Sequence, residues 1–165
     1  MILTSEHICK RIYGYLGEHL LDIVSASDGY EFLARDSSFV EIYNFKREQS
    51  PYTGRVYYTL PAPKNVGIRA YFRELGVKYR GHTFVIDGGG EDDYYMLSPT
   101  WKTMQALGDF PRHGYDPRYK AKESEMTDIW EERSPVEGFE FTVEPIVYLK
   151  KDGVWLIDSD GEEPA

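Results

Sequence analysis

The chain has 165 residues, a net charge of −9 and a single cysteine, Cys9. A chain of this length buries enough apolar surface to fold without a disulfide or a metal. With one cysteine, an intramolecular disulfide framework is excluded. No apolar run approaches the ~18 residues that span a bilayer, so no membrane partner is expected. The composition predicts a cytoplasmic protein with one globular domain over residues 1–158 and an acidic tail over residues 159–165.

The first predicted element is a helix that begins at Thr4 or Ser5. Apolar side chains then recur at intervals of four, four, four and three, which is typical of one helical stripe. They are Ile8, Ile12, Leu16, Leu20 and Ile23. Gly14 and Gly17 weaken this helix by about 1 kcal/mol each relative to alanine, so tertiary packing must hold it.

Short strands and a second helix are predicted next. Residues 30–35, 39–45 and 55–60 read as strands, the second of them central, and residues 46–54 read as a loop. A helix is expected over residues 66–78, because its apolar residues follow a helical spacing. They are Ile68, Phe72, Leu75 and Tyr79.

The second half of the chain is predicted to mix strands and short helices. Strands are expected over residues 82–86 and 94–97, followed by a helix from Ser98-Pro99 to Leu107. Ser124 is expected to cap a short helix, and Asp152-Gly153 to turn a C-terminal hairpin. The predicted fold class is α+β: an N-terminal amphipathic helix and two or three further helices packed on a mainly antiparallel sheet of five to seven short strands.

The charge is concentrated in the second half of the chain. Residues 1–80 carry 11 Lys and Arg against 9 Asp and Glu, whereas residues 81–165 carry 8 against 19, a net of −11. Such a surface repels nucleic acid and attracts basic proteins. The acidity is equally explained by solubility alone.

Three groups of residues are candidates for catalysis, ligand binding or metal binding, and each also fits a purely structural role. A catalytic acid–base set would consist of His82, Asp87 and His113. Binding of a phosphate or carboxylate would use Arg112, His113, Arg118 and Tyr119. A cation would be held by carboxylates of the predicted glycine-rich loop over residues 87–93, namely Asp87, Glu91, Asp92 and Asp93. No cofactor motif is present, so no cofactor is expected.

Tyrosines interleave with basic residues between positions 43 and 80. This pattern fits stacking of nucleotide bases, a protein interface, or half-buried strands that favour tyrosine.

A protein interface is predicted on the short helix expected over residues 123–132, where carboxylates surround an aromatic anchor. Its residues are Glu123, Glu125, Asp128, Trp130, Glu131 and Glu132. The first hypothesis for function is therefore a non-catalytic acidic binding protein of the inhibitor, immunity or phage anti-defence type, which docks a basic partner such as a nucleic-acid-acting enzyme. The alternative is a small enzyme or ligand sponge that acts on a nucleotide-like anionic small molecule.

Overall fold

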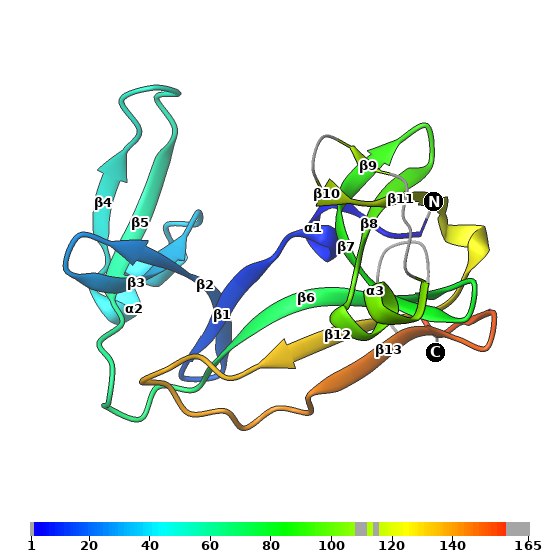
Figure 1. Cartoon of the computed structure of the whole chain (residues 1–165). Coiled ribbons are helices and arrows are strands. Elements are labelled where there is room, and N and C mark those ends of the chain that lie inside the picture. Colours follow the sequence, from blue (N-terminus) through cyan, green and yellow to red (C-terminus); the bar gives the residue numbers. More distant parts are fainter. Residues whose placement is uncertain (1, 108–111, 114–115, 158–165) are drawn as a thin grey trace. The chain divides into compact units, whose positions relative to one another are not determined.

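The computed structural model describes residues 2–107, 112–113 and 116–157, and its regular structure is almost entirely β (Figure 1). The α-helices of these residues are short: α1 (Ser5–Ile8), α2 (Ser38–Tyr43) and α3 (Trp101–Leu107). Twelve of the fourteen described strands belong to one antiparallel sheet. The predicted α+β fold, with several helices packed on five to seven strands, is therefore wrong.

The chain divides into two compact units. Unit 1 consists of residues 1–10, 73–133 and 144–165, and unit 2 of residues 11–72 and 134–143. A single domain over residues 1–158 stays a prediction, and the acidic tail expected over residues 159–165 lies outside the described residues. Within the described ranges, no helix combines the length and apolar character that crossing a membrane requires.

Unit 2 is built on antiparallel strands in the order β1-β2-β3-β5-β4. Their bounds are β1 (Arg11–Leu16), β2 (His19–Ala26), β3 (Gly29–Ala34), β4 (Lys46–Gln49) and β5 (Val56–Pro61). One face of these strands forms a core with Ile23, Phe32 and Ala34, which are all almost completely buried.

Unit 1 contains two sets of paired strands, β6-β7-β8-β11 and β6-β12-β13-β14, which share β6. Their bounds are β6 (Ala70–Tyr79), which begins in unit 2, β7 (His82–Glu91), β8 (Tyr94–Pro99), β11 (Tyr119–Lys122), β12 (Met126–Ser134), β13 (Ile146–Lys151) and β14 (Val154–Trp155). The short strands β9 (Arg112–His113) and β10 (Asp116–Pro117) pair only with each other. Leu75, Val77 and Phe84 lie in the core of this unit.

The predicted N-terminal helix is wrong, because its residues form α1 and then the β1–β2 hairpin. Residues four apart share a face of a strand as well as a stripe of a helix, so the spacing of Ile12 and Leu16 fits both structures. Gly17, with φ +62°, occupies the turn between the strands. A glycine adopts this left-handed conformation at little cost, and the chain reverses there.

The helix predicted over residues 66–78 is also wrong. In β6, Leu75, Val77 and Tyr79 are buried and Lys78 between them is exposed, which is the alternation of a strand. Arg80 and Gly81, with φ +51° and +79°, form the turn into β7. Of the expected apolar stripe, Leu75 and Tyr79 share the buried face of β6, because residues four apart lie on one face of a strand as well as of a helix.

Three further segments differ from their prediction. Residues 39–45 form most of helix α2 rather than a strand, and the predicted loop over 46–54 contains strand β4. The short helix expected over 123–132 is a 3₁₀ turn, η1 (Glu123–Glu125), followed by β12. The residues of the predicted acidic loop at 87–91 belong to β7, and only Asp92 and Asp93 form the turn.

Several local predictions are confirmed. Strands occur where residues 30–35, 55–60, 82–86 and 94–97 predict them. A helix also forms before Leu107, but its predicted start at Ser98-Pro99 is wrong, because these two residues belong to β8 and α3 begins at Trp101. Asp152 and Gly153, with φ +50° and +80°, turn the β13–β14 hairpin. This is the conformation in which Asp-Gly turns favour hairpins.

Gly14→Ala distinguishes the β1–β2 hairpin from a helix, because the two structures predict opposite signs. In a helix, alanine would stabilise the protein by about 1 kcal/mol. In β1, the added Cβ would lie 2.3 Å from Ile23 Cδ1. We therefore expect denaturant unfolding to show a loss of about 1–3 kcal/mol from overpacking.

Ile23→Val removes that Cδ1 atom, so the double variant should recover part of the loss as a coupling between the two sites. A Gly14→Ala protein at least as stable as the wild type would contradict the hairpin.

Candidate functional site

Asp87 is the centre of a polar network on unit 1. Its Oδ1 lies 2.6 Å from Lys10 Nζ, and its Oδ2 lies 2.9 Å from Arg118 Nη2 and accepts a 2.9 Å hydrogen bond from Ser98 Oγ. The hydrogen bond from Lys10 lowers the pKa of Asp87, and Ser98 and Arg118 lower it further against the opposing effect of burial. Asp87 is thus a paired, ionised carboxylate.

Strand register extends this network to a neighbouring carboxylate. Gly76 pairs with Val85, so Glu74 and Asp87, each two residues further along, lie on the same face of the β6–β7 pair. Burial raises the pKa of Glu74, Lys10 opposes the effect, and the carboxylates of Glu132 and Asp87 add to it. Burial is thus the main cause of the raised pKa of Glu74, and Lys10 is the charge with the largest single effect on it.

An aromatic pair lies on the same face. A Cβ placed on Gly76 would lie only 2.3 Å from Trp130 Cε2, so the indole packs directly on the backbone of β6. The Trp130 and Tyr148 rings are 6.0 Å apart on paired strands, and Trp130 Nε1 donates to Glu132 Oε2 at 3.3 Å. Figure 1 shows β12 running between β6 and β13.

These residues define what we call the acidic-aromatic face. It consists of Glu74, Gly76, Asp87, Trp130, Glu132 and Tyr148. Tyr148 keeps 37% of its surface exposed and Ile146, also on β13, keeps 47%. Carboxylates next to exposed aromatic surface can bind a guanidinium or ammonium group.

The predicted interface over residues 123–132 is only partly on this face. Trp130 and Glu132 belong to it, but Glu131 points to the other side of β12 and is only 14% exposed. Three other carboxylates make hydrogen bonds within the chain. Glu123 accepts from the Ile2 and Leu3 amides, Glu125 from the Lys122 amide, and Asp128 from the Asp152 amide.

The residues predicted to bind an anionic ligand do not form one site in the structure. Arg118 pairs with Asp87, whereas the Tyr119 ring packs 5.4 Å from Phe84 and 5.9 Å from Tyr79. The backbones of Arg112 and His113 form β9, and their side chains lie outside the described part of the structure. Arg118 and Tyr119 point to opposite faces of the sheet, so they do not form one site.

The predicted catalytic pair is not brought together. His82 and Asp87 are five residues apart on β7, which is about 16 Å of strand and places them on opposite faces. His82 instead borders a cavity of about 530 Å³ beside α3. The position of the His113 side chain is outside the described part of the structure.

The predicted metal ligands are also separated. Asp87 is engaged by Lys10 and Arg118, Asp92 and Asp93 occupy the turn at φ +52° and +65°, and the Glu91 side chain is not described. Among the described residues, no three His, Cys, Asp or Glu side chains lie close enough to hold a metal ion.

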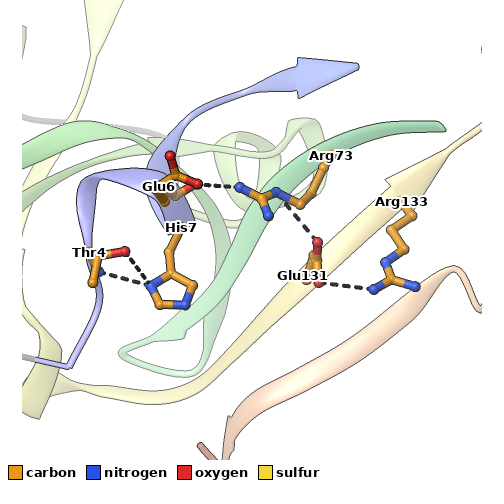
Figure 2. Close-up of polar contacts among 6 residues, drawn as sticks. All are labelled: Thr4, Glu6, His7, Arg73, Glu131 and Arg133. Carbon is orange, nitrogen blue, oxygen red and sulfur yellow. Dashed lines mark hydrogen bonds and ion pairs between the residues drawn. The ribbon is translucent and has the colours of Figure 1, made fainter. Parts of the chain in front are cut away.

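Sequence analysis missed a second polar cluster, which joins α1 to β6 and β12 (Figure 2). Glu131 lies 3.4 Å from Arg73 Nε and 3.2 Å from Arg133 Nη2, and Arg73 also donates to the backbone carbonyl of Glu6. These three charged side chains are at most 20% exposed. The cluster ties the N-terminal segment to the sheet.

His7 belongs to this cluster as a neutral imidazole. The Thr4 amide donates to His7 Nδ1 at 2.9 Å, and Thr4 Oγ1 lies 3.0 Å from the same nitrogen. Burial lowers the pKa of His7, Arg73 lowers it further, and Glu131 opposes both. The spacing Thr4-x-x-His7 resembles a capping box and is the sequence pattern that could have revealed this contact.

Comparison with known proteins gives no match to a family model, to a curated protein or to a solved structure. The geometry of the described residues is therefore the basis for any functional proposal.

Protonation of His7 should make folding pH-dependent. Its pKa in the folded protein is below the ordinary value of 6.5, so the unfolded chain binds a proton first as the pH falls. The stabilisation from neutral His7 should be complete above about pH 6.5 and decrease as the pH falls toward 5. Urea unfolding of wild type and His7→Gln at several pH values measures this effect.

Glutamine keeps an acceptor for the Thr4 amide but does not titrate. The wild type should therefore lose stability relative to His7→Gln on acidification, while the other groups titrate alike in both proteins. Parallel stability curves would show that His7 is not the responsible group.

Proposed function

We propose that this protein is a non-catalytic binding protein that docks a basic segment of a partner protein on the acidic-aromatic face of unit 1. The observation that carries the proposal is the position of Trp130 on Gly76, beside Tyr148 and Glu132. Glu74 lies two residues from Gly76 on the same face of β6. Such a surface offers both a π face and a charge to an incoming arginine.

The environment of Glu74 supports a cationic ligand. This carboxylate is half-buried, and its burial makes the ionised form less favourable. A guanidinium from a partner would compensate for the lost hydration and gain two hydrogen bonds with one carboxylate. The exposed parts of Tyr148 and Ile146 add apolar area around the contact.

The distribution of charge supports a basic partner. Unit 1 contains 12 Lys and Arg against 19 Asp and Glu, a net charge of −7, whereas unit 2 contains 7 against 9, a net of −2. A net negative unit attracts a basic surface and speeds association. Enzymes that act on nucleic acids have such surfaces, so an inhibitor, immunity or phage anti-defence role in the cytoplasm fits this chemistry.

Affinity capture from the native host, followed by kinetics with the recovered protein, tests the proposal. We expect a basic protein, with an association rate that falls steeply as salt increases. Glu74→Gln/Glu132→Gln should slow association by about tenfold at low salt and flatten its salt dependence, because two attractive charges are removed. Trp130→Ala should mainly speed dissociation.

The matched control is Glu41→Gln/Glu137→Gln, which changes the net charge equally at two exposed positions of unit 2. It should bind like the wild type apart from a small general effect of charge. Thermal melts of each variant establish that it is folded. Equal effects of the two double variants, or association that is indifferent to salt, would overturn the acidic-aromatic face as the binding site.

A second candidate function, a sponge for nucleotide-like anions, is favoured by the cavity beside α3. It is lined by Gly81, His82, Thr83, Thr100, Trp101, Lys102, Thr103 and Ala106. Trp101 is 70% exposed and could stack on a base, while His82 and Lys102 could bind a phosphate. The separation of His82 from Asp87 makes binding a better-supported role than catalysis for this cavity.

A thermal-shift screen of nucleoside mono-, di- and triphosphates tests this candidate. Binding at a hundredfold excess over Kd should stabilise the protein by about 2.7 kcal/mol, and Lys102→Gln should reduce the shift. Lys78→Gln, an exposed lysine of β6 outside the cavity, is the control. No stabilisation by any nucleotide would eliminate the sponge and leave the protein-binding proposal intact.

A further inference from the structure

Unit 2 has a cavity of its own, of about 600 Å³, on the face of the sheet that is opposite its core. Strands β2, β3 and β5 and the segment between β4 and β5 line it. Six residues that matter for its chemistry are Val24, Leu33, Val56, Tyr57, Arg35 and Arg55. This volume is within the range of small-molecule sites, about 300–1,000 Å³.

Strand register explains the apolar floor of this cavity. Leu33 pairs with Asp22 on β2 and with Thr59 on β5, which places Val24 and Tyr57, two residues away, on the same face. Ile23 and Phe32 point to the opposite face and are 4% and 0% exposed. Val24 and Leu33, in contrast, are only half-buried, so apolar surface remains available to a ligand.

The charged residues that line the cavity are two arginines, Arg35 and Arg55. Arg35 Nη1 lies 3.5 Å from Asp22 Oδ2, but the same oxygen is 3.2 Å from Arg11 Nη1, so one carboxylate faces two guanidinium groups. The Arg35 side chain is 66% exposed, and Arg55 adds a further cation at the rim. An anion between Arg35 and Arg55 would therefore be favoured.

The segment over residues 50–55 is ordered by its own hydrogen bonds. Ser50 Oγ accepts from the Tyr52 and Thr53 amides, and the Gly54 amide donates to the Ser50 carbonyl at 3.0 Å. The Gln49 side chain donates to the Gly54 carbonyl. These bonds hold Arg55 beside the floor before a ligand binds, which lowers the entropic cost of binding.

We propose that unit 2 binds a small amphipathic anion, with an aromatic or aliphatic body on Val24, Leu33 and Tyr57 and a carboxylate, sulfonate or phosphate between Arg35 and Arg55. A purely polar anion would leave the apolar floor unused, and a cation would be repelled by the rim. The site lies in a different unit from the acidic-aromatic face and does not depend on the proposed function.

Two fluorescent probes with the same kind of aromatic body test this site. Anilinonaphthalene sulfonate carries an anionic group, and N-phenylnaphthylamine lacks it. We expect the wild type to bind the sulfonate more tightly, with a blue shift in its emission. Arg35→Gln/Arg55→Gln should weaken sulfonate binding by about tenfold, equivalent to about 1.4 kcal/mol, and leave binding of the neutral probe unchanged.

The matched control is Lys46→Gln/Arg47→Gln, which removes two exposed charges of β4 outside the cavity. It should bind the sulfonate like the wild type. Leu33→Ser should weaken both probes, because it removes apolar surface from the floor. Thermal melts of these variants check that they are folded.

Amide chemical shifts of the wild-type protein locate the probe without any substitution. Shifts should change at Val24, Leu33, Arg35 and Tyr57 as the sulfonate is added. Changes confined to unit 1, equal affinity of the two probes in the wild type, or equal losses in the two double variants would each overturn the proposed site.

Discussion

The two-residue turns of unit 1 are the constraint on which its surface chemistry depends. Three of them contain consecutive residues with positive φ: Arg80-Gly81, Asp92-Asp93 and Asp152-Gly153. Such turns match the twist of the strands and fix their register. A slip of one residue would move every side chain of a strand to the other face. The pairing of Gly76 with Val85, set by the first turn, is therefore what places Glu74 beside Asp87.

Several of the carboxylates that make the sequence acidic form hydrogen bonds or ion pairs within the protein. Glu123 accepts from two N-terminal amides and from the Tyr95 hydroxyl, and Lys150, which is 5% exposed, donates to its backbone carbonyl. Burial, together with the hydrogen bond to Glu123, raises the pKa of Tyr95, so that hydroxyl stays a donor. Glu131 is held between two arginines in the same way. These carboxylates hold the fold together, because a buried charge requires partners.

Features set by adjacent residues, such as turns, could be predicted from the sequence. The choice between helix and strand could not, because it was inferred from the spacing of apolar residues alone. Asp152-Gly153 identified a hairpin because its turn chemistry is local. The interval of four between Ile12 and Leu16 did not separate a helix from a strand, since both structures place such residues on one side. Leu20, in contrast, lies on the other face of the hairpin and is exposed. If Gly17 and Arg80-Gly81 had been interpreted as hairpin turns, strands would have been predicted in place of the N-terminal helix and the helix over residues 66–78. Contacts such as Lys10 with Asp87, 77 residues apart, leave no local pattern.

The net charge of −9 is a poor guide to what each surface can bind. On unit 1, Asp87 is neutralised by Lys10 and Arg118, whereas Glu132 accepts a hydrogen bond from the Trp130 indole. On unit 2, a net charge of −2 coexists with a cavity whose charged lining residues are Arg35 and Arg55. Because screening limits each charge to a range of about 8–10 Å, local pairing rather than the total decides the sign that a ligand meets. One acidic chain can therefore present a surface suited to a cation and a cavity suited to an anion.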